Sequence, residues 1–377
     1  MTGTAFDMAR VLAEGAQRLA DGRLVAFPTE TVYGLGADAE NPTAVAAIYA
    51  AKGRPSNHPV IVHVAPEADL SYWAASVPPE ARALIQAFWP GPLTLILPRA
   101  AHIPAAVSGG QRSVGLRCPS HPVAQALLRE FARLKPSGQG GVAAPSANKF
   151  GQVSPTHARH VREEFAELGE DELLVLEGGP SQVGIESTII DVSRLAQGVG
   201  PVLLRPGHIT AMQLAEVLGM ALGRPDATAP RVSGSLKAHY APRTPLSILT
   251  RAELASLAKG RTGQASEVAS QEDAHSSKGK PLNDSAAGRR AVALVFEPLP
   301  ELKARPVHEG EASTASAQHL DWRICSSDPN IYARDLYALL RELDGLGYTH
   351  IYLEAPPRNE AWRAVNDRIG RAAAAFA

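Results

Sequence analysis

The chain has few cysteines and no excess of charge of either sign. Its 377 residues include only Cys118 and Cys325, too few for a disulfide framework or a structural zinc site. We interpret Cys118 as a structural residue because it lies beside a predicted strand. The formal net charge of the chain is -1, so no basic excess attracts a nucleic-acid backbone. A small-molecule substrate therefore fits better than tight, direct RNA binding.

The sequence also lacks the signals of membrane insertion and export. No apolar run approaches the ~20 residues that a helix needs to cross a bilayer. The N-terminus carries early acidic residues and an amphipathic helical pattern in place of a basic stretch followed by an apolar one. These features predict a soluble, cytoplasmic protein with no membrane contact.

Several well-known site motifs are absent. The chain has neither a GxxxxGK[ST] phosphate loop nor a GxGxxG dinucleotide motif, since Gly34-Leu35-Gly36 lacks the third glycine. His157 and His160 have the spacing of a helical metal pair, but no HExxH motif or third ligand accompanies them. We therefore expect both histidines at the surface near a helix start, and no protein-bound metal.

What is present is an alternation of helical patterns with short apolar runs, which predicts an α/β fold. The expected helices cover residues 8–21, 42–52, 78–88, 122–134, 210–222, 332–343 and 360–375. The expected strands cover residues 24–27, 60–64, 93–97, 114–116, 142–144, 173–176, 188–192, 202–204, 291–296 and 350–353.

The length of the chain predicts two domains. We place a first domain at residues 1–225, a Pro/Gly/Ser-rich linker at 226–245 and a smaller α/β domain at 246–377. Residues 259–290 are polar and poor in aromatics, which is typical of a flexible insertion. The second domain shows no catalytic constellation.

Polar, turn-rich motifs adjoin the predicted strands of the first domain. Side chains at strand ends are presented on a rigid scaffold, so these motifs predict a polar pocket where the strands end. The motifs are FPTETVYGLGADA (27–39), KGRPSNHPVIVHV (52–64), WPGPLTLIL (89–97), SVGLRCPSH (113–121), APSANKFGQVSPT (144–156) and GIESTIIDV (184–192).

Cationic residues in these motifs can bind anions. Lys52 and Arg54 lie two positions apart in a turn bounded by glycine and proline, where one can meet a phosphate as a point charge and the other as a planar fork. The alternative is a solvated helix end that the helix dipole favours. Arg117 follows a strand and can hold a carboxylate with two hydrogen bonds, or it can form a surface ion pair.

The other polar residues of the motifs have two interpretations each. His63, between apolar neighbours, is either a hydrogen-bonded core histidine or a functional one. His58 is the more exposed and can touch phosphate. Glu30 and Glu186 either act in the site or support its loops. The hydroxyl and amide candidates for phosphate and ribose contacts, each otherwise a turn or helix-cap residue, are Ser113, Ser146, Asn148 and Ser154.

The ordered motifs, with LLRPG (203–207) and HYAP (239–242), closely resemble the two-domain Sua5/YrdC/YwlC family of threonylcarbamoyl-adenylate synthases over residues 8–245. The resemblance implies a twisted, open mixed sheet with flanking helices, followed by a smaller Rossmann-like α/β Sua5 domain. It also implies that L-threonine, bicarbonate and ATP become threonylcarbamoyl-AMP and pyrophosphate for a tRNA modification. Mg²⁺ would accompany ATP without dedicated protein ligands, and a threonylcarbamoyl-transferase complex would receive the adenylate.

The resemblance implies roles for individual residues. Its threonine pocket falls on Thr31, His63, Arg117, Ala144 and Ser187. Its ATP site falls on Lys52, Arg54, His58, Ser113, Ser146, Asn148, Ser154, Arg205 and Tyr240, with Lys52 and Arg54 also catalytic. Position 58 is His where many relatives have Asn. The linker segment around Tyr240 would act as a lid over the nucleotide.

Two alternatives were considered, one of them another enzyme and the other a protein of a different class. Carbamoyl transfer of the hydrogenase-maturation type uses a related domain, but also an acylphosphatase region and cysteine-rich zinc segments that two cysteines cannot supply. A module that binds double-stranded RNA or regulates other proteins is the second alternative, which the near-neutral charge disfavours.

Overall fold

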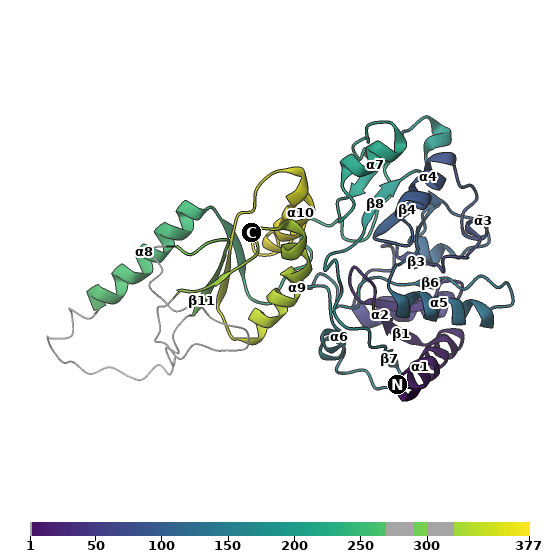
Figure 1. The fold of residues 1–377 in the computed structure, drawn as a ribbon, viewed down its shortest axis with the longest axis horizontal. Coiled ribbons are helices and arrows are strands. Elements are labelled where there is room, and N and C mark those ends of the chain that lie inside the picture. Colours follow the sequence, from purple (N-terminus) through teal and green to yellow (C-terminus); the bar gives the residue numbers. More distant parts are fainter. Residues whose placement is uncertain (1, 269–289, 300–319) are drawn as a thin grey trace.

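The computed structural model describes residues 2–268, 290–299 and 320–377, and it confirms the α/β class. The chain forms a large mixed sheet with flanking helices and a separate parallel sheet of four strands (Figure 1). No helix in the described part of the chain is both long and apolar enough to span a bilayer.

The large sheet belongs to the N-terminal domain. Its nine strands have the order β7-β1-β2-β6-β3-β5-β4-β8-β9 and pair in both parallel and antiparallel fashion. They are β1 (Leu24–Phe27), β2 (Gly34–Asp38), β3 (Ile61–His63), β4 (Leu93–Pro98), β5 (Ser113–Arg117), β6 (Val142–Ala143), β7 (Leu173–Val175), β8 (Thr188–Asp191) and β9 (Val202–Arg205).

Local capping signals set the helices around this sheet. Asn41 caps the first turn of α2 by accepting from two backbone N–H groups, and Gly53 ends the helix with a φ of 62°. Lys52 therefore lies at the last turn of α2. The helices are α1 (Thr2–Ala20), α2 (Pro42–Lys52), α3 (Leu70–Trp73), α4 (Pro79–Phe88), α5 (Pro122–Leu134), α6 (Ala158–Glu164) and α7 (Ala211–Leu218), with 3-10 turns at Ala105–Ser108 and Leu195–Gln197.

The C-terminal domain contains the parallel sheet, with strand order β10-β13-β11-β12. Its helices α9 and α10 lie on the side that faces the N-terminal domain, whereas α8 lies on the far side (Figure 1). The elements are β10 (Leu246–Leu249), α8 (Arg251–Val268), β11 (Ala291–Val295), β12 (Leu320–Ile324), α9 (Pro329–Gly345), β13 (His350–Glu354), a 3-10 turn (Glu360–Trp362) and α10 (Arg363–Ala373).

The two domains share one hydrophobic cluster. Val32, Val153 and Ile185 of the N-terminal domain pack with the buried residues of the small domain, and Tyr240 of the linker joins them. Arg341 of α9 also pairs with Glu164 of α6 at 2.8 Å. Such burial opposes free movement of one domain against the other.

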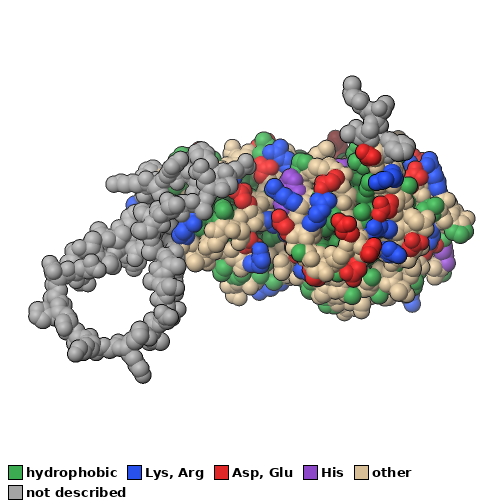
Figure 2. Space-filling view, turned by 90° about the horizontal axis from the view of Figure 1, so that it is seen from below, with side chains coloured by type: hydrophobic (Ala, Val, Ile, Leu, Met, Phe, Trp, Pro, Cys, Tyr) green, Lys and Arg blue, Asp and Glu red, His purple; other side chains and the backbone are tan. Residues whose placement is uncertain are grey.

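Basic and acidic side chains are interspersed on the face of the molecule that Figure 2 shows.

The structure corrects several expectations. Residues 259–268 of the predicted insertion belong to helix α8, and positions 269–289 lie outside the described residues. The helix expected at 210–222 ends at Leu218, because Gly219 adopts a left-handed φ of 65°. His160 is buried, not at the surface, and its Nδ1 accepts from the Thr156 N–H at 3.3 Å. The expected strands are present, whereas β2, β10 and β12 were not predicted.

Candidate active site

A small, polar cavity of about 40 Å³ lies where several strands of the large sheet end. The β1–β2 loop, the last residues of β3, β5 and β9, and the segments after β6 and before β8 form its walls. The linker closes it. The lining residues are Thr29, Thr31, Val32, Gly34, Arg54, Ile61, His63, Arg117, Ala144, Pro145, Ser146, Glu186, Ser187, Arg205, Ser233, Gly234, His239 and Tyr240.

All the residues predicted for the threonine pocket lie on this wall. The Thr31 hydroxyl is 2.8 Å from that of Thr29, and the Ser187 hydroxyl is 2.7 Å from that of Thr94. His63 is 3% exposed, and its Nδ1 has no hydrogen-bond partner among the described residues. Burial and the nearby Arg117 lower the pKa of His63 to about 3, so the imidazole is neutral at pH 7 and free to bind a ligand.

Arg117 at the end of β5 forms a buried ion pair, not a surface one. Its Nη2 lies 2.6 Å from Oε1 of Glu30, and both side chains are 4% exposed. The Ser120 N–H holds the other carboxylate oxygen at 3.1 Å, so Glu30 fixes the guanidinium against the cavity wall. Glu30 thus supports Arg117, one of the two roles considered for it.

Two further arginines line the cavity, and both were predicted for the ATP site. Nη2 of Arg54 donates to the Pro59 carbonyl (2.7 Å) and to the Ser233 hydroxyl (2.8 Å). Arg205 donates to the carbonyls of Ser187 (2.8 Å) and Ser233 (2.9 Å). Neither guanidinium pairs with a carboxylate in the part of the chain that the structure describes. Burial lowers the pKa of Arg54 to about 10, so it stays charged at neutral pH.

Tyr240 covers the same side from the linker and is 1% exposed. Its φ is 62°, a left-handed conformation that costs a non-glycine residue free energy. Gly234 lies against it: a Cβ built there would come within 1.9 Å of the Tyr240 hydroxyl oxygen. Ser146, also predicted for ATP, lines the same cavity.

Five predicted ATP residues do not line the closed cavity. The buried Lys52 ammonium donates to the carbonyls of Ser146 (2.6 Å) and Asn148, so it orders the loop after β6. Asn148 donates through its amide to the Gln152 carbonyl at 3.0 Å. Burial and Arg54 lower the pKa of Lys52 well below its usual value.

The remaining three also lie outside the cavity lining. Ser113 is the buried first residue of β5, and the ring of the half-buried His58 contacts Phe150 edge-on at 5.5 Å. The Ser154 hydroxyl donates to Glu186 at 2.6 Å. In this closed arrangement, Ser154 therefore supports the wall without facing the cavity.

Sequence reasoning missed several wall residues. Ser233, Gly234 and His239 come from the linker, which was predicted as a lid without assigning these residues to the site. Glu186 was considered for the site, but no partner was predicted for it. Its position next to the predicted residue Ser187 was the signal that could have placed it on the cavity wall. The other missed residues are Thr29, Val32, Gly34, Ile61 and Pro145.

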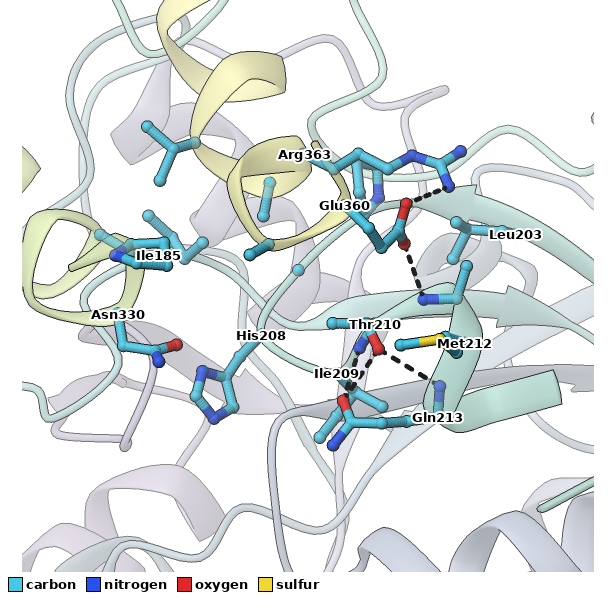
Figure 3. A pocket seen from close by; sticks show the side chains of 18 residues that line it. Ile185, Leu203, His208, Ile209, Thr210, Met212, Gln213, Asn330, Glu360 and Arg363 are labelled. Atoms are coloured by element: carbon cyan, nitrogen blue, oxygen red, sulfur yellow. Dashed lines mark hydrogen bonds and ion pairs between the residues drawn. The ribbon is translucent and has the colours of Figure 1, made fainter. Parts of the chain in front are cut away.

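A second, larger cavity of about 430 Å³ lies between the domains (Figure 3). Glu360 accepts from the Ala211 N–H at the start of α7 and pairs with Arg363 at 3.5 Å, and His208 and Asn330 also line the cavity (Figure 3). None of the residues predicted for the site lines it. The smaller cavity is the better candidate despite its size, because the buried, unpaired polar atoms of His63, Arg54, His239 and Tyr240 gather there.

The fold and the cavity define a two-domain α/β protein with a cavity that contains three arginines and lies beneath an interdomain linker. Residues 17–207 match a family model described as telomere recombination, Sua5/YciO/YrdC. Residues 209–374 match one described as the C-terminal domain of threonylcarbamoyl-AMP synthase. The chain belongs to the Sua5/YciO/YrdC family, in the two-domain form of Sua5.

The chain is also similar to individual members of this family. Threonylcarbamoyl-AMP synthases of Pyrococcus abyssi and Bacillus subtilis are 42% and 44% identical over 59% and 63% of the chain. These matches span 63% and 66% of those two relatives, just under two thirds of their length. The structure of P. abyssi Sua5 complexed with L-threonine aligns with 97% of the chain and 94% of that protein, with a TM-score of 0.73 and 30% identity.

Proposed function

We propose that the chain is an L-threonylcarbamoyladenylate synthase, which forms threonylcarbamoyl-AMP and pyrophosphate from L-threonine, bicarbonate and ATP. The observation that carries this proposal is the pair of buried guanidinium groups, Arg54 and Arg205, without a carboxylate partner among the described residues. A buried charge is costly unless it is paired, so this cavity favours a strongly anionic ligand. The triphosphate of ATP supplies such a charge.

In the proposed reaction, the amine of threonine attacks bicarbonate, and water leaves as the carbamate forms. A carbamate oxygen then attacks the α-phosphorus, and pyrophosphate leaves. Arg117 holds the threonine carboxylate, while Lys52 and Arg54 neutralise the phosphate charge. The carbamate is already anionic, so this second step needs alignment and charge stabilisation more than a general base.

We propose that magnesium enters with ATP and is held by phosphate and water. The described residues contain no group of three His, Cys, Asp or Glu side chains that could hold a metal. Both nearby carboxylates are paired with an arginine: Glu186, which lines the cavity, with Arg368, and Glu30, which lies behind the lining, with Arg117. Mg²⁺ commonly retains water and substrate phosphates as ligands, and it would spread the triphosphate charge.

The linker is proposed to act as a lid. A cavity of about 40 Å³ is far below the roughly 300–1,000 Å³ typical of ligand pockets, so ATP cannot enter while the linker holds this position. The linker must open for the nucleotide and close again over the adenylate. Closure would exclude water from a product that hydrolyses readily.

The partners follow from the same proposal. A cytoplasmic threonylcarbamoyl-transferase complex would receive the adenylate and pass its threonylcarbamoyl group to tRNA. Because basic and acidic side chains are interspersed on the face in Figure 2, we propose weak or no direct tRNA binding.

The decisive experiment measures pyrophosphate release from ATP with threonine and bicarbonate added together or singly. Release should require both, and mass spectrometry should identify threonylcarbamoyl-AMP. Pyrophosphate release that does not depend on threonine would contradict the proposed function.

A further inference from the structure

We infer that Arg368 of the C-terminal domain is a positioning residue that joins the Glu186-Ser187 wall of the active site to Tyr240 of the linker. The inference rests on the proposed function and assigns a role there to the second domain. Arg368 lies in α10 and is fully buried. It contacts the cavity wall through Glu186 and would therefore act on the substrates indirectly.

The guanidinium of Arg368 binds two separate segments of the N-terminal domain. Its Nε donates to Oε2 of Glu186 at 2.8 Å, and its Nη2 donates to the main-chain carbonyls of Glu186 (3.3 Å) and Pro206 (3.1 Å). Nη1 donates to Asp367 at 2.6 Å. These contacts fix the segment before β8, which lines the active site, and Pro206, which directly follows the lining residue Arg205 at the end of β9.

Glu186 is held from both domains at once. The Ser154 hydroxyl donates to one carboxylate oxygen at 2.6 Å, and the Tyr337 hydroxyl of α9 donates to the other at 3.0 Å. Burial alone would raise the pKa of Glu186, but the nearby arginines and Ser154 lower it to about 2. The next residue, Ser187, lines the cavity and accepts from Arg205, so a shift of Glu186 would carry this contact with it.

The same group of residues also holds the lid. The Arg368 guanidinium lies 5.2 Å from the centre of the Tyr240 ring, and Tyr337 stacks on that ring at 5.8 Å. One turn further along α10, the side chain of Arg371 donates to the Leu236 carbonyl, and the main-chain carbonyl of Arg371 accepts from the His239 N–H at 3.2 Å. Helices α9 and α10 thus form the surface on which the second half of the linker rests.

A purely stabilising role explains this arrangement poorly. Buried ion pairs often contribute little net stability, because desolvation offsets the attraction between the charges. The planar guanidinium of Arg368 instead fixes one defined position of α10 against Glu186. Helix α9 also lies close to the segment before β8, since a Cβ built on Gly184 would lie 2.3 Å from the backbone of Arg334 in α9.

The test uses the full chain with Arg368→Lys, which keeps the charge but cannot reproduce the planar fork. Tyr337→Phe removes only the hydroxyl that reaches Glu186. Arg363→Lys is the matched control, because Arg363 begins the same helix and its side chain is 50% exposed. We expect Arg368→Lys to lower kcat by about tenfold or more, with the KM for threonine within about threefold of the parent value. Tyr337→Phe should have a smaller effect, and the control none.

Hydrogen exchange provides a readout that does not depend on turnover. Without ligand, the amides of residues 232–241 should exchange about tenfold faster in Arg368→Lys than in the parent or the control, while the strands of both sheets keep their protection. Parent-like kcat and linker exchange in Arg368→Lys would overturn the inference. Loss of protection throughout both sheets would also overturn it, since it would indicate a fold defect. An unmodified chain that releases no pyrophosphate would refute the proposed function instead, and the exchange comparison would still decide the role of Arg368.

Discussion

Replacing Arg117 tests the threonine pocket, provided that loss of binding is separated from loss of folding. In Arg117→Gln, the threonine carboxylate loses a charged hydrogen-bonded partner, worth about 1.5–3 kcal/mol. That loss corresponds to about a 10- to 150-fold weaker threonine affinity. The same change leaves the buried carboxylate of Glu30, whose side chain is 4% exposed, without its ion-pair partner. Removing one partner of a buried pair costs about 3–5 kcal/mol of unfolding free energy.

The variant of Glu30 separates the two effects. Glu30→Gln leaves the guanidinium in place without its internal counter-charge, so threonine should bind as tightly as in the parent or more tightly, although the fold is less stable. The double variant removes both charges and should recover part of the stability without recovering threonine affinity. Arg129→Gln is the control, because Arg129 pairs with Glu67 at the surface, where the side chains are 41% and 63% exposed.

Calorimetric titration with threonine and urea unfolding measure the two quantities independently. If Arg117→Gln binds threonine with parental affinity while remaining folded, Arg117 does not hold the carboxylate. A double variant that regains threonine affinity together with stability would also contradict the reasoning, because it would mean that the loss in Arg117→Gln came from the stranded Glu30.

The remaining predictions concern the phosphate side, the lid and acid stability. Lys52→Ala and Arg54→Ala should each lower kcat for pyrophosphate release more than they weaken threonine binding; full release by the double variant would exclude the role. Tyr240→Ala should reduce turnover and leave the linker sensitive to limited proteolysis even with ATP and threonine bound. If this variant turns over normally, and ATP and threonine do not protect the parent linker from proteolysis, the linker is only a spacer. Burial holds the pKa of His63 and of His239 at about 3 in the folded chain, so the unfolded chain binds more protons between about pH 6.5 and 3. The free energy of unfolding should therefore fall as the pH drops through this range, by up to about 1.4 kcal/mol per pH unit for each histidine. A free energy of unfolding in urea that does not change with pH would contradict this.

Elements with local signals were predictable from the sequence. Helix α5 spans Pro122–Leu134, as predicted, because a proline begins it and its apolar residues recur at helical spacing. Helix α2 is equally well defined by Asn41 and Gly53. In both cases, the residues that set the boundary lie within one turn of it, so no tertiary information was needed.

Strand β2 was missed because its sequence, GLGAD, has little strand propensity. Tertiary packing explains the glycine at its centre. A Cβ built on Gly36 would lie 2.8 Å from atoms of Phe27 and Val142, and 2.9 Å from the Val25 carbonyl. The position therefore needs the absence of a side chain, a requirement that becomes visible only when the neighbouring strands are in place.

In the candidate site, too, residues with a local sequence signal could be predicted, whereas residues placed by tertiary contacts could not. Strand-end residues such as His63 and Arg117 could be proposed because each follows an apolar run. Their partners from elsewhere could not: Arg54 and Ser233 are 179 positions apart, and Glu186 and Arg368 are 182 positions apart. A contact over such a separation leaves no periodic trace in the sequence, and Arg368 sits in an amphipathic helix that looks like an ordinary domain surface.

The contacts of the linker divide it into two parts with different relations to the nucleotide. Ser233 supplies a hydroxyl to Arg54 and a carbonyl to Arg205, so it occupies donors that phosphate oxygens would need. Tyr240 instead rests on Arg368 and Tyr337 of the C-terminal domain. A charged phosphate is a stronger acceptor than a hydroxyl or a carbonyl. ATP binding must therefore displace the Ser233 part, whereas the Tyr240 part can keep its contacts and direct the linker back over the occupied site.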